Sequence, residues 1–156
     1  MKYATRFLEG TIKVVEFRAP HYTFEDTSIM KDRFEPARQV SRFLATQLEK
    51  SGLNVGRGIE IVKITSIGRK VETGGKQFWI SVGSNRSEDW FIQIHSSTFL
   101  SRLVGEPDSA ELEKLSGCLD EALRSDKKIE DIQWFTIDEW LDRFELRFRE
   151  YNEGQW

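Results

Sequence analysis

Two strand-like runs joined by a short polar loop constrain the fold of this chain more than any other feature. The runs are Gln77–Gly83 and Asp89–His95, and the loop between them is Ser84–Glu88. Apolar residues recur at every second position in both runs, which is typical of strands with one buried face. We therefore predict an antiparallel hairpin, and we expect Val82 to lie opposite Trp90.

The predicted hairpin has two unlike faces. The first face is wholly apolar and belongs in the core. It carries Phe78, Ile80, Val82, Trp90, Ile92 and Ile94, with Ile80 facing Ile92 and Phe78 facing Ile94. The second face is mixed, so either a helix of this chain or a partner protein could cover it. Its residues are Trp79, Ser81, Phe91, Gln93 and His95.

Further strands extend this hairpin into a larger sheet. The segment before it reads as one long strand, or as two strands separated by a bulge at Gly68. Gly74 and Gly75 form a two-residue turn, which places Val71 opposite Phe78. The result is a meander over residues 59–73, 76–83 and 89–95. Strands are also predicted at Tyr3–Phe7, Thr11–Phe17 and Ile129–Phe135.

Three main helices are predicted from apolar residues at helical spacing. They span Glu35–Ser51, Asp108–Ser125 and Thr136–Tyr151, and a short extra helix spans Thr98–Val104. The first helix should bury Ala37, Val40, Phe43, Leu44 and Leu48. The second should bury Leu112, Leu115, Leu119, Ala122 and Leu123. The predicted fold is a single α+β domain, residues 1–156. Its antiparallel sheet of about four to six strands is packed by the three helices on one face.

Composition is that of a soluble globular protein. The hydrophobic fraction is 38% and the charged fraction 31%. No apolar run approaches the roughly 18 residues of a membrane span, and the N-terminus lacks the apolar core of a signal peptide. The single cysteine, Cys118, excludes an internal disulfide framework. We expect a cytoplasmic protein without membrane contact.

Charge is distributed unevenly along the chain. Residues 1–105 contain 16 Lys and Arg against 11 Asp and Glu, whereas residues 106–156 contain 7 against 15. Binding to nucleic acid is disfavoured, because phosphate recognition needs concentrated positive charge and no dense basic run occurs. The acidic C-terminal part is either a set of solvated helix faces or a surface that steers a basic protein partner.

Five residues are candidates for binding a partner. On the last predicted helix, Glu139, Asp142 and Glu145 point away from an apolar stripe that includes Trp140. The other two candidates, Trp79 and Phe91, lie on the mixed face of the hairpin. They are explained either by packing under a helix or by a protein-binding surface, where Trp and Phe are enriched.

No residue pattern predicts catalysis, a metal or a cofactor. His21, His95 and Cys118 do not have the spacing of metal ligands. His95 with Ser96 and Ser97 could supply a base and a nucleophile, but adjacent strand residues point to opposite sides. There is also no Gly-x-Ser-x-Gly elbow. We therefore expect no catalytic residues, no metal ligands and no cofactor.

Four segments together carry a resemblance to a known group of proteins. They are FWISVG at Phe78–Gly83, DWFIQI at Asp89–Ile94, FLSRLVG at Phe99–Gly105 and IEDIQW at Ile129–Trp134. Over residues 59 to 140 the chain resembles small bacterial proteins, some of which are immunity proteins against polymorphic or contact-dependent toxins.

The resemblance implies a cytoplasmic, non-enzymatic inhibitor that binds one cognate toxin and covers its active site. It implies no particular site residues, because the matching positions are those of the sheet and helix core. Two alternatives stay open at this point: a small adaptor or chaperone of a secretion or defence system, and, third, a hydrolase.

Overall fold

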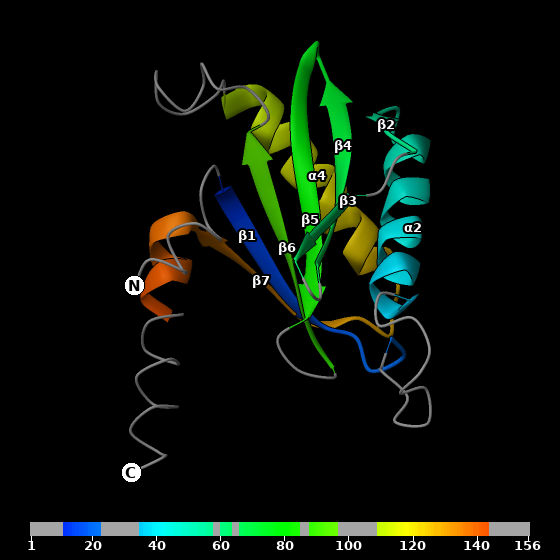
Figure 1. Ribbon diagram of the computed structural model, residues 1–156, viewed down its shortest axis with the longest axis vertical. Helices are drawn as coiled ribbons and strands as arrows, with labels where there is room; N and C mark the ends of the chain where they lie inside the picture. Colours follow the sequence, from blue (N-terminus) through cyan, green and yellow to red (C-terminus); the bar gives the residue numbers. More distant parts are fainter. Residues whose placement is uncertain are drawn as a thin grey trace.

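The computed structural model describes residues 11–22, 35–57, 60–63, 66–84, 88–96 and 109–143 (Figure 1). Within these residues, seven strands form one sheet in which every pairing is antiparallel. The strands are β1 (Thr11–Arg18), β2 (Asn54–Val55), β3 (Glu60–Lys63), β4 (Ser66–Thr73), β5 (Lys76–Ser84), β6 (Asp89–Ser96) and β7 (Glu130–Thr136). The sheet order is β2-β4-β5-β6-β1-β7, and β3 also pairs with β4. The predicted α+β class with an antiparallel sheet is confirmed.

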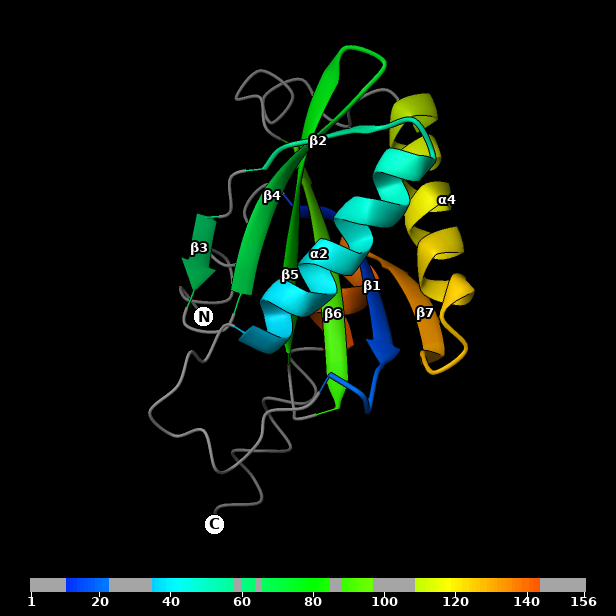
Figure 2. The ribbon, with the colours of Figure 1, turned by 90° about the vertical axis from the view of Figure 1, so that its right-hand side faces the viewer.

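Two helices, α2 (Glu35–Lys50) and α4 (Ser109–Ser125), cover one face of the sheet. Figure 2 shows them side by side on this face. Both predicted stripes are buried there, although Phe43 and Leu112 stay partly exposed. The main core lies between these helices and the sheet, and its largest buried side chains are Trp90, Phe78, Leu44, Leu48, Ile67, Ile80, Ile92, Ile94, Leu115, Leu119 and Leu123.

A third helix, described for residues 137–143 and called here the terminal helical segment, packs on the opposite face. A capping box begins this segment, since the Glu139 N–H donates to Thr136 Oγ1 at 3.2 Å and the Thr136 N–H donates to Glu139 Oε1 at 3.3 Å. Trp140 packs on Phe91 and Val14 in a second, smaller cluster.

The prediction that all three helices lie on one face was therefore wrong. Neighbouring residues of a strand point to opposite faces of the sheet. Val15 and Ile92 face α2 and α4, so Val14 and Phe91 face the other way. An apolar pair on that side needs its own cover, which Trp140 provides with only 3% of its surface exposed.

The register of the central hairpin also differs from the prediction. Val82 lies opposite Ile92, and Trp90 lies opposite Ser84. The two strands are thus displaced by two positions from the predicted pairing. A two-residue shift keeps every side chain on the same face, so both registers bury the same apolar residues and alternation cannot distinguish them.

The predicted bulge at Gly68 was wrong as well. The chain reverses between β3 and β4, with Lys63 opposite Ser66 and Glu60 opposite Gly68. Gly68 is thus an ordinary paired residue of β4. Two separate strands are therefore present, and the chain passes from one to the other between Lys63 and Ser66 rather than at Gly68.

The turn between β4 and β5 is as predicted. Val71 lies opposite Phe78, and Thr73 opposite Lys76. Gly74 and Gly75 have φ values of 57° and 80°, a left-handed conformation that glycine adopts without steric cost. The turn also touches α4, because the Thr73 hydroxyl donates to Glu111 Oε2 at 3.1 Å.

Replacing Gly74 by alanine is expected to destabilise the protein by about 1–3 kcal/mol, because a left-handed conformation costs an L-residue about 1–2 kcal/mol. The added methyl group would also meet the Glu111 carboxylate. Gly75→Ala is the matched control, since it has a positive φ but nothing near its new methyl group. Urea denaturation measures both losses. Equal losses for the two variants would show that the contact with Glu111 is unimportant, and a Glu111→Ala background should remove any difference between them.

β7 is held between β1 and α4. It pairs with β1, and the Trp134 indole N–H donates to Asp120 Oδ1 at 3.0 Å. Burial by itself would raise the pKa of the Asp120 carboxyl, but hydrogen bonds from Arg124 and Trp134 outweigh it, so this pKa lies below its ordinary value.

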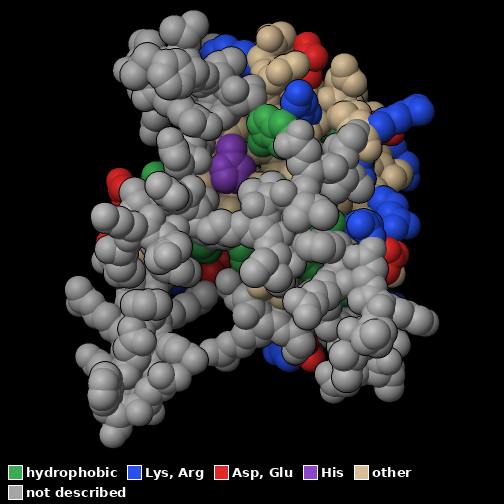
Figure 3. Space-filling model, in the orientation of Figure 1, with side chains coloured by type: hydrophobic (Ala, Val, Ile, Leu, Met, Phe, Trp, Pro, Cys, Tyr) green, Lys and Arg blue, Asp and Glu red, His purple; other side chains and the backbone are tan. Residues whose placement is uncertain are grey.

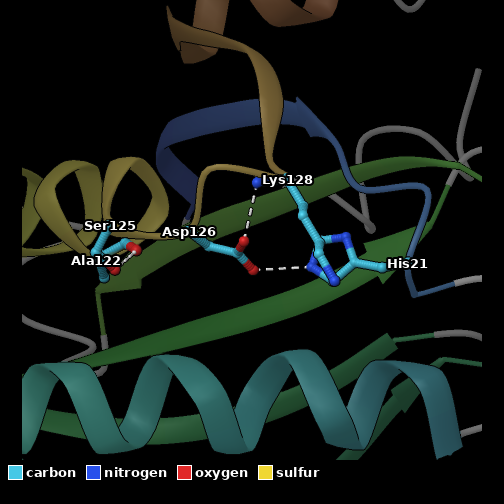
Figure 4. A network of polar contacts seen from close by, with 5 residues as sticks. All are labelled: His21, Ala122, Ser125, Asp126 and Lys128. Carbon is cyan, nitrogen blue, oxygen red and sulfur yellow. Dashed lines mark hydrogen bonds and ion pairs between the residues drawn. The ribbon is translucent and has the colours of Figure 1, made fainter.

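The turn that leads into β7 is tied to the end of β1 (Figure 4). His21 Nε2 lies 2.8 Å from Asp126 Oδ2, and the Lys128 backbone N–H donates to Asp126 Oδ1 at 3.0 Å. These contacts hold the start of β7 beside β1.

Several predicted elements lie outside the described residues. They are the strand Tyr3–Phe7, the short helix Thr98–Val104 and the continuation of the last helix to Tyr151, which includes Glu145. Among the helices that are described, none has both the length and the apolar composition needed to cross a membrane.

Candidate functional site

The face of the sheet opposite α2 and α4, called here the second face, carries most of the candidate residues. Figure 3 looks onto this side and shows a histidine next to a hydrophobic side chain at the surface. Two rows of paired residues cross it. One row runs Lys70–Trp79–His95, and the next runs Gly68–Ser81–Gln93–Val14.

His95 joins two hydroxyl groups on this face. Its Nε2 lies 3.0 Å from Ser81 Oγ, and its Nδ1 lies 3.1 Å from Thr11 Oγ1. The three residues come from β6, β5 and β1, so the contact links the meander to the N-terminal strand. The sequence placed Ser81 and His95 on one face, but it gave no signal for Thr11, because the pairing of β1 with β6 joins residues far apart in the chain.

Gln93 lies beside this group and is 2% exposed. Its amide nitrogen Nε2 has no hydrogen-bond partner within the part of the chain that the structure describes. A buried unpaired amide costs free energy, and an ordered water molecule is the usual way in which such a group is satisfied.

Trp79 and Phe91, which were grouped in the sequence, have different surroundings. Phe91 is 4% exposed and its ring centroid lies 5.7 Å from that of Trp140, so packing accounts for it. Trp79 remains half-buried, and Lys70 Nζ lies 5.3 Å from its ring centroid. Of the two aromatic candidates, only Trp79 offers surface to a partner.

The acidic candidates of the terminal helical segment also differ from one another. Glu139 is exposed but serves the capping box through Thr136. Asp142 is exposed, as is Asp138, which the sequence analysis did not select. Glu145 lies outside the described residues. The segment is tied to the sheet by Glu16, which accepts from the Trp140 indole N–H at 3.2 Å and lies 3.3 Å from Arg143.

A buried arginine, Arg69, lies on the core face and is a structural contact. Its Nε donates to Ser41 Oγ at 2.7 Å, and a terminal nitrogen donates to the Gly56 carbonyl at 3.1 Å. Burial, followed by the nearby Arg42, lowers the pKa of the guanidinium. These bonds connect β4, which carries Arg69, to α2 and to the residue that directly follows β2. The Arg69 side chain is therefore part of the internal packing.

Among the described residues, no three His, Cys, Asp or Glu side chains come close enough together to hold a metal ion. Cys118 is partly buried on α4. The candidate site is a surface on one side of the sheet, with the partly exposed Trp79 on the second face and the exposed Asp138 and Asp142 on the terminal helical segment that packs on this face.

The Ser81–His95 pair is expected not to act as a nucleophile and its base. Ser81 is 2% exposed, so a substrate cannot reach its hydroxyl, and the two nitrogens of His95 lie within hydrogen-bond distance of the Ser81 and Thr11 hydroxyls. A fluorophosphonate should not label the protein, as intact mass would show beside a serine hydrolase as positive control. Stoichiometric labelling that disappears in Ser81→Ala would contradict this and favour the hydrolase alternative.

No protein-family model matches the chain, and neither does a characterised protein or a solved structure. The fold and the site geometry alone therefore support the functional proposals below.

Proposed function

We propose that this protein is a non-enzymatic, protein-binding inhibitor of the immunity type, which acts in the cytoplasm and covers the active site of a cognate toxin. One observation carries the proposal. The segment Glu130–Asp142 contains five acidic residues and no basic residue, and its described helical part lies on the same side of the sheet as the half-buried Trp79.

The two parts of this surface suit different tasks in binding. Exposed carboxylates such as Asp138 and Asp142 attract a basic partner at long range and speed its association. A tryptophan on a sheet loses little side-chain entropy on binding, and tryptophan is enriched among the residues that dominate binding energy. The sheet and the second cluster around Trp140 hold both parts in fixed positions.

A basic partner fits the proposed role. Toxins that cleave nucleic acid need positive charge around the substrate, because phosphate binding depends on it. An inhibitor that presents carboxylates in place of phosphates can occupy such a cleft without any catalytic group of its own.

The test is a binding and inhibition assay with the toxin encoded by the gene next to that of this protein. We expect an equimolar complex with a Kd of about 1 nM or below, as for other tight inhibitor complexes. Toxin activity should fall in proportion to the inhibitor added, and an unrelated toxin should be unaffected. Absence of a complex would overturn the proposal, whereas a complex that leaves the toxin active would favour the adaptor or chaperone alternative.

A further inference from the structure

The two edges of the described sheet are built differently. At one edge, the outer side of β4 is covered by the two short strands β2 and β3. At the other edge lies β7, a strand of seven residues that pairs only with β1 among the described strands. An unpaired edge presents backbone N–H and C=O groups that can hydrogen-bond with another extended chain.

A bulge defines which part of β7 is regular. Arg18 lies opposite Glu130 and Glu16 opposite Gln133, so the single residue Phe17 faces two residues of β7. The first of these, Asp131, has a φ of 54°. The bulge, formed by Asp131 and Ile132, bends the start of the strand and leaves Gln133–Thr136 as a regular run, which is long enough to pair with a short strand.

The charges around this edge select the partner. Glu130 and Asp131 are exposed at the start of β7, and Asp138 and Asp142 are exposed just beyond its end. Lys127 and Lys128 precede the strand, but no basic residue occurs from Glu130 to Asp142. Two cations contact side chains of β7. Lys13 of β1 lies over the Trp134 ring, and Arg143 lies over the Phe135 ring but is paired with Glu16, so its charge is balanced.

We infer that the edge of β7 is a docking site for an extended, lysine- or arginine-rich segment of the partner protein, which adds to the sheet as an extra antiparallel or parallel strand. The inference rests on the proposed function and specifies its binding mode. Backbone hydrogen bonds to β7 provide affinity, and the flanking carboxylates select basic side chains. A second copy of this chain fits less well, because it would bring two acidic edges together.

The probe is a synthetic peptide of about nine residues in which valine and threonine alternate with lysine, since such residues favour strands. Two matched peptides separate backbone pairing from charge. One has every lysine replaced by glutamate. The other keeps the lysines but is N-methylated at two adjacent central residues, which removes an N–H from each edge of the strand. Affinity is measured by titration, and hydrogen exchange of the β7 amides is followed by NMR spectroscopy.

We expect the basic peptide to slow exchange within Gln133–Thr136 and not at β2 or β3. Its affinity should exceed that of either control peptide by about tenfold or more. The N-methylated peptide loses a backbone hydrogen bond to β7 and places a methyl group in the contact, and the acidic peptide replaces each charge attraction by a repulsion. Asp131→Lys with Asp138→Lys should weaken binding by a similar factor, whereas Glu113→Lys with Glu121→Lys on α4 should not.

Three outcomes would overturn the inference. Equal affinity for the basic and N-methylated peptides would show that the peptide binds through charge attraction alone, without backbone pairing to β7. Protection of β7 that depends on protein concentration without peptide would identify a second copy as the occupant. Unchanged β7 exchange in a complex with the neighbouring toxin would refute strand addition while leaving the proposed function intact, because that function fails only if no inhibitory complex forms.

Discussion

Replacing Trp90 by alanine is expected to lower the free energy of unfolding by about 3–5 kcal/mol, the range for large aromatic deletions in protein cores. Trp90 is 0% exposed and is among the largest fully buried side chains. It lies on β6 between Phe17 of β1 and Ser84 of β5, at the point where three strands meet under α2 and α4.

Urea denaturation followed by circular dichroism measures this effect. Trp79→Ala is the matched control, because it removes the same side chain from the same sheet at a half-buried position on the second face. Its loss should be less than half that of Trp90→Ala. A loss below about 1 kcal/mol for Trp90→Ala would mean that the site is not a tightly packed core position.

The largest expected functional effect concerns the charge of the terminal helical segment. Reversing Asp138 and Asp142 to lysine should slow association with the neighbouring toxin by about tenfold to a hundredfold at low salt, since surface charge acts mainly on the association rate. The difference should shrink above about 0.1 M salt, where charges more than about 10 Å apart are screened. Stopped-flow binding at two salt concentrations measures both effects.

Glu139 is left unchanged in this variant, although its charge faces solvent, because it completes the capping box with Thr136. Reversing it would also cost helix stability, which would confuse the result. Glu113→Lys with Glu121→Lys is the matched control, since these exposed residues lie on α4, on the other side of the sheet. If both double variants slow association equally, overall charge matters and the terminal helical segment is not the contact surface.

Most of the elements could be predicted from the sequence because their signals are local. The alternation in β1, β5 and β6 and the helical spacing in α2 and α4 depend on residues a few positions apart. The turn at Gly74 and Gly75 was predicted for the same reason, since only its conformation and the two strands beside it are involved. Burial of Trp90 followed from its place on the apolar face of β6.

The candidate site was predicted less well. Trp79 is partly exposed on the second face, and Asp142 is exposed on the terminal helical segment. Phe91, in contrast, is buried beneath Trp140. Asp138 is exposed as well but was not selected, because it is adjacent to Glu139 and neighbouring carboxylates are usually solvated. The edge position of β7 was not predicted either, because the order of strands in a sheet depends on contacts between segments far apart in the chain.

By itself, then, the sequence determined where most of the described strands and helices lie and which side of each is apolar, because these properties arise from the chemistry of neighbouring residues. Only the tertiary structure decided the hairpin register, since a shift of two positions keeps all side chains on their faces. It also decided that the terminal helical segment packs against Val14 and Phe91, that Thr11 meets His95, and that β7 lies at the edge. Each of these depends on how distant segments share the two faces and the two edges of one sheet, and no local pattern carries that information.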